Sequence, residues 1–207
     1  MAQVKLYAVP LGEAQGLFGA RPDVAERVRA MTADLIAAKP KRRVFFAGGQ
    51  TRTPVPPQEF EPSQHDVEAM LAGRYPAPDR IVPAWLLLEQ VLAGISRARH
   101  VTPLPDTADP VGSLDFALAA AGVGAEHGLR HLLDASAELP THAPRRVRVG
   151  CVPADHARAM AASWASASLA EGPIRQAVTD LAGWLTAVFG PDGRDSSDVD
   201  LLAILHP

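Results

Sequence analysis

The chain has 207 residues, of which 47% are hydrophobic and 21% charged, and its formal net charge is −3. This composition is close to that of an average folded domain and excludes wholesale disorder. The length predicts a single domain with its own hydrophobic core. The mild charge excludes a global electrostatic field that would hold nucleic acid or an anionic membrane surface, so we expect neither among the partners.

The cellular compartment is indicated by three features of the sequence. Cys151 is the only cysteine, so no internal disulfide can form, which is typical of a reducing compartment. Residues 1–10 lack the basic and apolar regions of a signal peptide, and no run approaches the roughly 18 apolar residues of a membrane span. Only three of the 20 basic residues are lysines, as in proteins from GC-rich bacterial genomes. We expect a bacterial cytoplasmic protein.

The first quarter of the chain predicts two strands with helices between them. Apolar and polar residues alternate over 4–9, as in a half-buried strand, and Pro10 then begins a short helix. One apolar stripe predicts a second helix over 22–38. The apolar run 44–47 predicts a second strand.

A Pro- and Gly-rich stretch over 48–62 is the longest predicted loop. Loops of this length are uncommon in compact domains unless they cover a functional surface. Ser63 follows it with Asp66 three residues later, which is the pattern of a capped helix start.

Six further helices are predicted in the rest of the chain, because apolar stripes follow prolines or capping residues there. In chain order they cover 63–71, 83–95, 113–122, 125–137, 153–164 and 173–189. Two more strands are predicted, at 146–152 from its alternating pattern and at 201–205 from its continuous apolar run.

These elements predict the fold class. Strands do not alternate regularly with helices, which favours an α+β fold over a doubly wound parallel sheet. We expect a single domain in which about eight helices cover a small sheet of three to five strands. Six large side chains on apolar helix stripes should form much of the core: Trp85, Leu88, Leu92, Trp164, Leu181 and Trp184.

Three polar residues on the helix predicted over 125–137 are candidates for catalysis or metal binding. On a continuous helix His127, His131 and Asp134 lie within roughly 60° of one another, away from the apolar stripe. Two histidines one turn apart can share a divalent metal ion, with His156 or His65 as a further ligand. The alternative is a solvated polar face, because the zinc motif H-E-x-x-H is absent.

Two further candidate sites are weaker. Arg42 and Arg43 could form an anion-binding edge with Arg146 and Arg148 if their strands are neighbours, although no phosphate-binding motif is present and a solvated charge cluster explains them too. Cys151 could be a nucleophile, but its place on the apolar face of a strand favours an inert, buried thiol.

The order of several segments resembles the YfbM-like family of small bacterial proteins of unknown function. These segments are Leu6–Phe18, Asp66–Gly73, Trp85–Glu89, His127–Leu133, Val149–Met160 and Asp200–His206. The resemblance implies an α+β fold and assigns no catalytic residue. The loop over 48–62 departs from the family pattern.

The sequence favours a binding or interaction module for an unidentified protein or small-molecule ligand, because no complete catalytic or cofactor motif is present. The alternative is a small metal-assisted or acid–base enzyme that uses His127, His131 and Asp134. The apolar helices could also form a homodimer face.

Overall fold

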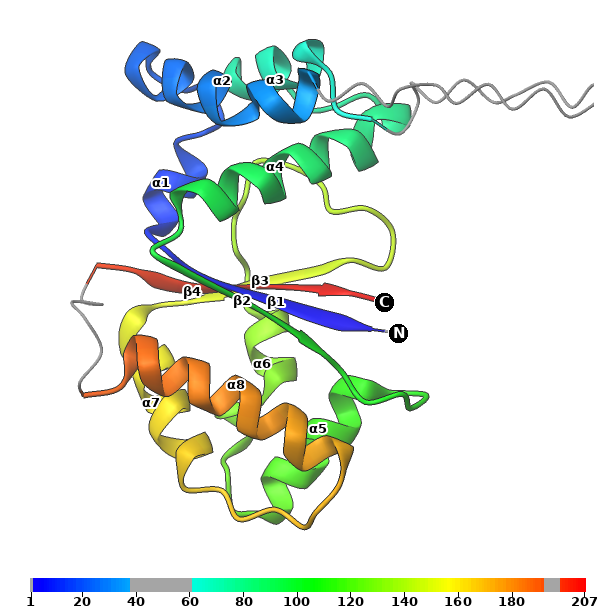
Figure 1. Ribbon diagram of the computed structural model, residues 1–207, viewed down its shortest axis with the longest axis vertical. Helices are drawn as coiled ribbons and strands as arrows, with labels where there is room; N and C mark the ends of the chain where they lie inside the picture. The colour runs from blue at the N-terminus through cyan, green and yellow to red at the C-terminus, as the bar shows by residue number, and fades with distance from the viewer. Residues whose placement is uncertain (1, 38–60, 192–197) are drawn as a thin grey trace, which may run out of the picture. The chain divides into compact units, whose positions relative to one another are not determined.

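The computed structural model describes residues 2–37, 61–191 and 198–207 (Figure 1). They form two compact units. The sheet unit comprises Met1–Gln15, Ile95–Leu139 and Ala143–Pro207, and the helical unit comprises Gly16–Gly94 and Pro140–His142. The single-domain organisation expected from the length stays a prediction, whereas the α+β fold class is confirmed.

The sheet unit is built on four antiparallel strands in the order β2-β1-β4-β3. The strands are β1 (Gln3–Val9), β2 (Ala98–Pro103), β3 (Arg148–Val152) and β4 (Asp200–His206). The two central strands, β1 and β4, are the most apolar, and residues 201–204 of β4 are fully buried. Three of these strands are those predicted near 4–9, 146–152 and 201–205.

Strand β2 was not predicted from the sequence, which indicated only two strands after residue 62, at 146–152 and 201–205. Its alternate side chains, such as Arg99 and Val101, are exposed. Because β2 is an edge strand, it tolerates polar residues and a terminal proline that a central strand would not. The strand predicted at 44–47 and most of the loop predicted at 48–62 lie outside the described residues.

Helices α5 to α8 cover one face of the sheet within the sheet unit (Figure 1). They are α5 (Pro110–Ala120), α6 (Leu129–Asp134), α7 (Ala154–Ala165) and α8 (Pro173–Phe189), and α1 (Leu11–Gln15) follows β1. The core between sheet and helices includes Leu6, Leu114, Met160 and Leu185, each at most 2% exposed. Asp109 caps α5 by accepting the Gly112 amide proton, so this helix begins three residues before the predicted start at 113.

The prediction of one continuous helix over 125–137 is wrong. A short 3-10 turn, η3 (Ala125–His127), is separated from α6 by Gly128, whose backbone is extended. The Asp115 carboxylate accepts hydrogen bonds from the amides of Leu129 at 2.7 Å and Arg130 at 2.9 Å, and so caps α6 from the neighbouring helix. A tertiary cap therefore overrides the helical periodicity of the sequence.

The helical unit contains α2 (Pro22–Ala37), α3 (Gln64–Leu71), the 3-10 turn η2 (Pro78–Arg80) and α4 (Ile81–Ile95). Its buried side chains include Val28, Val67 and Leu92. Arg29 on α2 forms a bidentate ion pair with Glu68 on α3, with both N–O distances at 2.8 Å. No helix in the described ranges is long and apolar enough to cross a membrane.

Five of the six predicted core residues are buried, each at most 3% exposed. The sixth, Trp184, is only half-buried. Its ring stacks on the ring of His100 on the edge strand, with centroids 6.0 Å apart. Asp180, one turn earlier on α8, lies 2.9 Å from His100 Nε2. Trp184 thus shields a polar contact at the rim of the sheet instead of filling its centre.

Candidate functional site

Three histidine rings meet in the sheet unit, and two of them are the predicted His127 and His131. The third is His156 on α7, one of the two residues named as a further ligand. The His156 ring stacks on the His131 ring at a centroid distance of 5.3 Å and meets the His127 ring edge-on at 5.5 Å. We call these three residues the histidine cluster. The other residue named as a further ligand, His65, lies in the helical unit.

Asp134 is paired with a residue outside the predicted set. Its carboxylate forms an ion pair with Arg148 on β3, and it makes no hydrogen bond or ion pair with the histidine cluster in the described part of the chain. The expected common face depended on a continuous helix, which the extended backbone at Gly128 interrupts. His156 reaches His131 through tertiary packing instead.

A hydrogen bond shows which nitrogen of the His156 ring carries a proton. Its Nε2 lies 2.9 Å from the carbonyl oxygen of Glu126. A carbonyl oxygen can only accept, so Nε2 carries the proton. In the neutral ring Nδ1 then carries the free lone pair, which is the form in which an imidazole can bind a metal ion or accept a proton.

Packing fixes the backbone on either side of the cluster. The Trp164 indole Nε1 donates a hydrogen bond of 2.7 Å to the carbonyl oxygen of His127. On the other side, α6 lies directly on β3, since a Cβ atom added at Gly150 would lie 2.7 Å from the Leu132 carbonyl carbon and 2.8 Å from Leu133 Cα. Only glycine at position 150 permits this approach.

The rings of His127 and His131 make no hydrogen bond within the described ranges. His131 is exposed, while His127 and His156 are half-buried. In the same ranges no group of three or more His, Cys, Asp or Glu side chains is already arranged to hold a metal ion. The metal-binding and catalytic roles of His127, His131 and Asp134 stay predictions.

The other predicted site residues are placed as follows. Arg42 and Arg43 lie outside the described residues, so the shared anion-binding edge stays a prediction. Arg146 is exposed, and Arg148 is paired with Asp134. Cys151 is buried, and burial raises the pKa of its thiol to about 12, which agrees with the interpretation of an inert side chain.

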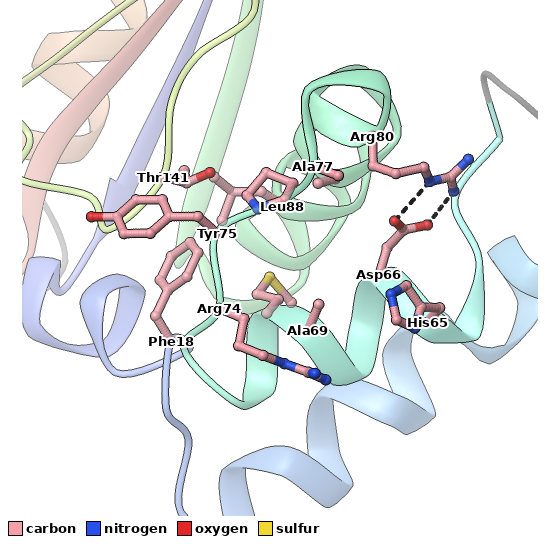
Figure 2. A pocket seen from close by; sticks show the side chains of 13 residues that line it. Phe18, His65, Asp66, Ala69, Arg74, Tyr75, Ala77, Arg80, Leu88 and Thr141 are labelled. Carbon is pink, nitrogen blue, oxygen red and sulfur yellow. Dashed lines mark hydrogen bonds and ion pairs between the residues drawn. The ribbon is translucent and has the colours of Figure 1, made fainter.

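A pocket in the helical unit was not found by sequence reasoning (Figure 2). It has a volume of about 60 Å³. Its walls come from α3, from α4, from the segment between them and from two single residues, Phe18 and Thr141. Figure 2 shows Tyr75, Phe18 and Thr141 on one side of the pocket, and His65 with the Asp66–Arg80 pair on the other.

The polar wall of this pocket is satisfied within the protein. Arg80 Nε donates to Asp66 Oδ1 at 3.0 Å, and the second guanidinium nitrogen pairs with Asp66 Oδ2. Asp66 Oδ2 also accepts the Ser63 amide proton at 2.8 Å, which confirms the predicted helix cap. Burial alone raises the pKa of Asp66, but the hydrogen bonds from Arg80 and Ser63 outweigh it and hold the pKa below its usual value.

The opposite wall of the pocket is aromatic and apolar. The Tyr75 ring stacks on the ring of His142, with centroids 5.3 Å apart. Arg74, beside Tyr75, is exposed on the pocket rim. Within the described residues the Arg74 side chain has no hydrogen bond or ion pair, in contrast to that of Arg80. Only the capping pattern at Ser63 and Asp66 signalled this site in the sequence.

Comparison with known proteins assigns no function to either site. No family model, curated protein or solved structure matches this chain significantly. The resemblance to the YfbM-like family therefore stays a prediction.

Proposed function

We propose that this protein is a binding module of the bacterial cytoplasm, and that the pocket of the helical unit receives a small anionic group of its ligand. The observation that carries the proposal is the position of Arg74, an arginine without an ion pair among the described residues, at the rim of a partly apolar pocket. The compartment is supported by the single buried cysteine.

The charge of the pocket favours an anion. The Asp66 carboxylate is neutralised by Arg80 and is only 4% exposed, so it does not repel a second carboxylate as a free acid would. Arg74 then supplies the unbalanced charge. A guanidinium presents paired N–H donors that match the two oxygens of a carboxylate or the oxygens of a phosphate.

The size of the pocket limits what it can hold. Sites for drug-sized ligands usually have volumes of about 300–1,000 Å³, whereas this pocket has about 60 Å³. That volume accommodates only a few non-hydrogen atoms. We therefore propose that it holds one group of a larger ligand, with a glutamate or aspartate side chain of a partner protein as the simplest candidate.

The pocket walls favour such an anchor group. The exposed Tyr75 ring stacks on His142 and offers an aromatic surface to an incoming group. Met70 and Leu88 supply apolar contacts for the methylene carbons of an acidic side chain. A buried anchor surrounded by polar contacts is the usual arrangement at binding hot spots.

Titration with side-chain mimics tests the proposal. N-acetyl-glutamate amide, its uncharged counterpart N-acetyl-glutamine amide and inorganic phosphate are added to ¹⁵N-labelled protein, and backbone amide shifts are followed. We expect saturable shifts at residues 74–77 with the glutamate mimic and none with the glutamine mimic.

Two variants complete the test. Arg74→Gln should weaken the binding by about tenfold or more, because a hydrogen bond to a charged group contributes about 1.5–3 kcal/mol. Arg99→Gln, which removes an exposed charge from β2 in the sheet unit, is the matched control. Equal binding of the charged and uncharged mimics, or equal affinity in Arg74→Gln and wild type, would refute the anionic site.

A further inference from the structure

We infer that the histidine cluster binds a divalent transition-metal ion, with Zn²⁺ as the reference ion and with Nδ1 of His156 as the central ligand atom. The cluster lies in the sheet unit, so this inference is independent of the proposed function of the helical unit. It keeps His127 and His131 as they were predicted from the sequence, selects His156 rather than His65 as the further ligand, and leaves out Asp134.

The spacing of the rings fits a shared ion. At a metal–nitrogen distance of 2.0–2.1 Å and tetrahedral angles, the centroids of two imidazole ligands lie roughly 5 Å apart. The centroids of His156 and its two neighbours are 5.3 and 5.5 Å apart. Small side-chain rotations can therefore bring their nitrogens around one ion.

The second ring nitrogen of His156 already has the partner that a metal ligand needs. Metal-binding histidines usually donate their other N–H to a carboxylate, a carbonyl or water, which orients the ring and fixes its tautomer. The Glu126 carbonyl oxygen accepts the Nε2 proton at 2.9 Å. This leaves Nδ1 as the donor atom for a metal ion.

The two neighbouring rings can adjust while their backbones are held in place. The Trp164 hydrogen bond holds the backbone of His127, and the close approach to Gly150 holds α6, which carries His131. The rings themselves make no hydrogen bond within the described ranges. Because His131 is exposed, its side chain can turn toward His156 without breaking core contacts.

The surrounding charges do not oppose a cation. Arg130, next to His131, is paired with Asp109 at 2.9 Å, and Arg158, two residues after His156, is paired with Asp155. An ion can approach from a groove of about 410 Å³ that has His131 in its lining. An all-imidazole set favours Zn²⁺, Ni²⁺ or Cu²⁺ over the oxygen-seeking Mg²⁺ and Ca²⁺.

Calorimetric titration of the metal-free protein with Zn²⁺ tests the inference, with the protein prepared without a polyhistidine tag. We expect one ion per chain and no binding of Mg²⁺. His156→Ala should weaken Zn²⁺ binding by at least about tenfold, whereas His65→Ala, which removes an exposed histidine from the helical unit, should leave it unchanged. Circular dichroism checks that each variant is folded.

A spectroscopic measurement identifies the ligand atoms. Long-range ¹H–¹⁵N NMR should show Nδ1 of His156 shifting on addition of Zn²⁺ while Nε2 stays protonated. The inference is overturned if wild type fails to bind Zn²⁺, or if the folded triple variant His127→Ala, His131→Ala, His156→Ala binds it as tightly as wild type. Should His156→Ala be misfolded, His156→Gln and the NMR measurement on wild type decide.

Discussion

The Nε2 atom of His156 lies 2.9 Å from the carbonyl oxygen of Glu126, a residue 30 positions earlier in the chain. This hydrogen bond joins α7 to the 3-10 turn η3 and makes His156 Nδ1 the free nitrogen of the ring. A second bond, from Trp164 Nε1 to the His127 carbonyl oxygen, joins the same two elements. The position of the histidine cluster therefore depends on backbone carbonyls of a turn that the sequence alone places inside a helix.

The hydrogen bond from Trp164 Nε1 to the His127 carbonyl oxygen should contribute measurably to the free energy of unfolding. Trp164→Phe keeps an aromatic ring in the core but removes the N–H donor and leaves the His127 carbonyl oxygen without it. We expect a loss of about 1–3 kcal/mol of unfolding free energy, measured by urea denaturation. Trp85→Phe is the matched control, because the buried Trp85 Nε1 has no hydrogen-bond partner among the described residues. A larger loss in Trp85→Phe than in Trp164→Phe would contradict this role.

Gly150→Ala should be among the most destabilising single substitutions in the sheet unit. The added Cβ would lie 2.7 Å from the Leu132 carbonyl carbon, and this backbone atom cannot move without shifting α6. We expect a loss of about 3 kcal/mol or a failure to fold. Gly183→Ala on α8 has open space around its Cβ and should instead stabilise by about 0.5–1 kcal/mol. Thermal melts of the two variants that shift equally would show that α6 and β3 are not in such close contact.

The Asp66–Arg80 ion pair predicts that the stability of the helical unit depends on pH. Since the pKa of Asp66 in the folded protein lies below its ordinary value of 3.8, the ionised carboxylate stabilises the fold at any pH above that ordinary value. This stabilisation should be lost as the pH falls below about 4 and through the lower folded-state pKa.

Denaturation between pH 2 and pH 7 measures this dependence. Asp66→Asn should be less stable than wild type at pH 7, and the difference should shrink toward pH 2. Asp23→Asn, at an exposed position on α2, is the control and should change stability little at any pH. A wild-type stability advantage over Asp66→Asn that grows on acidification would reverse the sign and refute the assignment.

Cys151 should be unreactive in the native protein. Burial raises the pKa of its thiol to about 12, so almost no thiolate exists at pH 8. We expect a disulfide reagent to label it only slowly in buffer and completely in denaturant. Rapid labelling of the folded protein would show that β3 exposes this thiol.

The sequence predicted the parts of the fold that local patterns determine. The alternation over 4–9 and the apolar run over 201–205 mark central strands, whereas β2 carries the polar pattern of an edge. The break at Gly128 could not be foreseen, because the Asp115 carboxylate that caps α6 comes from another helix. Local pattern therefore failed for two reasons: a distant group competes for the backbone at Gly128, and an edge strand such as β2 carries no apolar alternation.

The candidate sites show the same division. His127, His131 and Asp134 were grouped on one continuous helix, whereas His127 lies in η3 and the other two lie in α6. The rings of His127 and His131 meet that of His156 through tertiary packing, and the Asp134 carboxylate pairs with Arg148. In the pocket, Ser63 and Asp66 were recognised as a cap. Their partner Arg80, 14 residues beyond Asp66, was not, because long-range ion pairs leave no periodic signal.

The proposed binding site is tested most directly by the side-chain NMR signal of Arg74. The Nε–Hε resonance of each arginine reports on the hydrogen bonds of its guanidinium. On titration with N-acetyl-glutamate amide, the Arg74 signal should move to saturation, while that of exposed Arg99 stays in place and N-acetyl-glutamine amide has no effect. An Arg74 signal that does not move, or that moves no more than the Arg99 signal, would contradict the account.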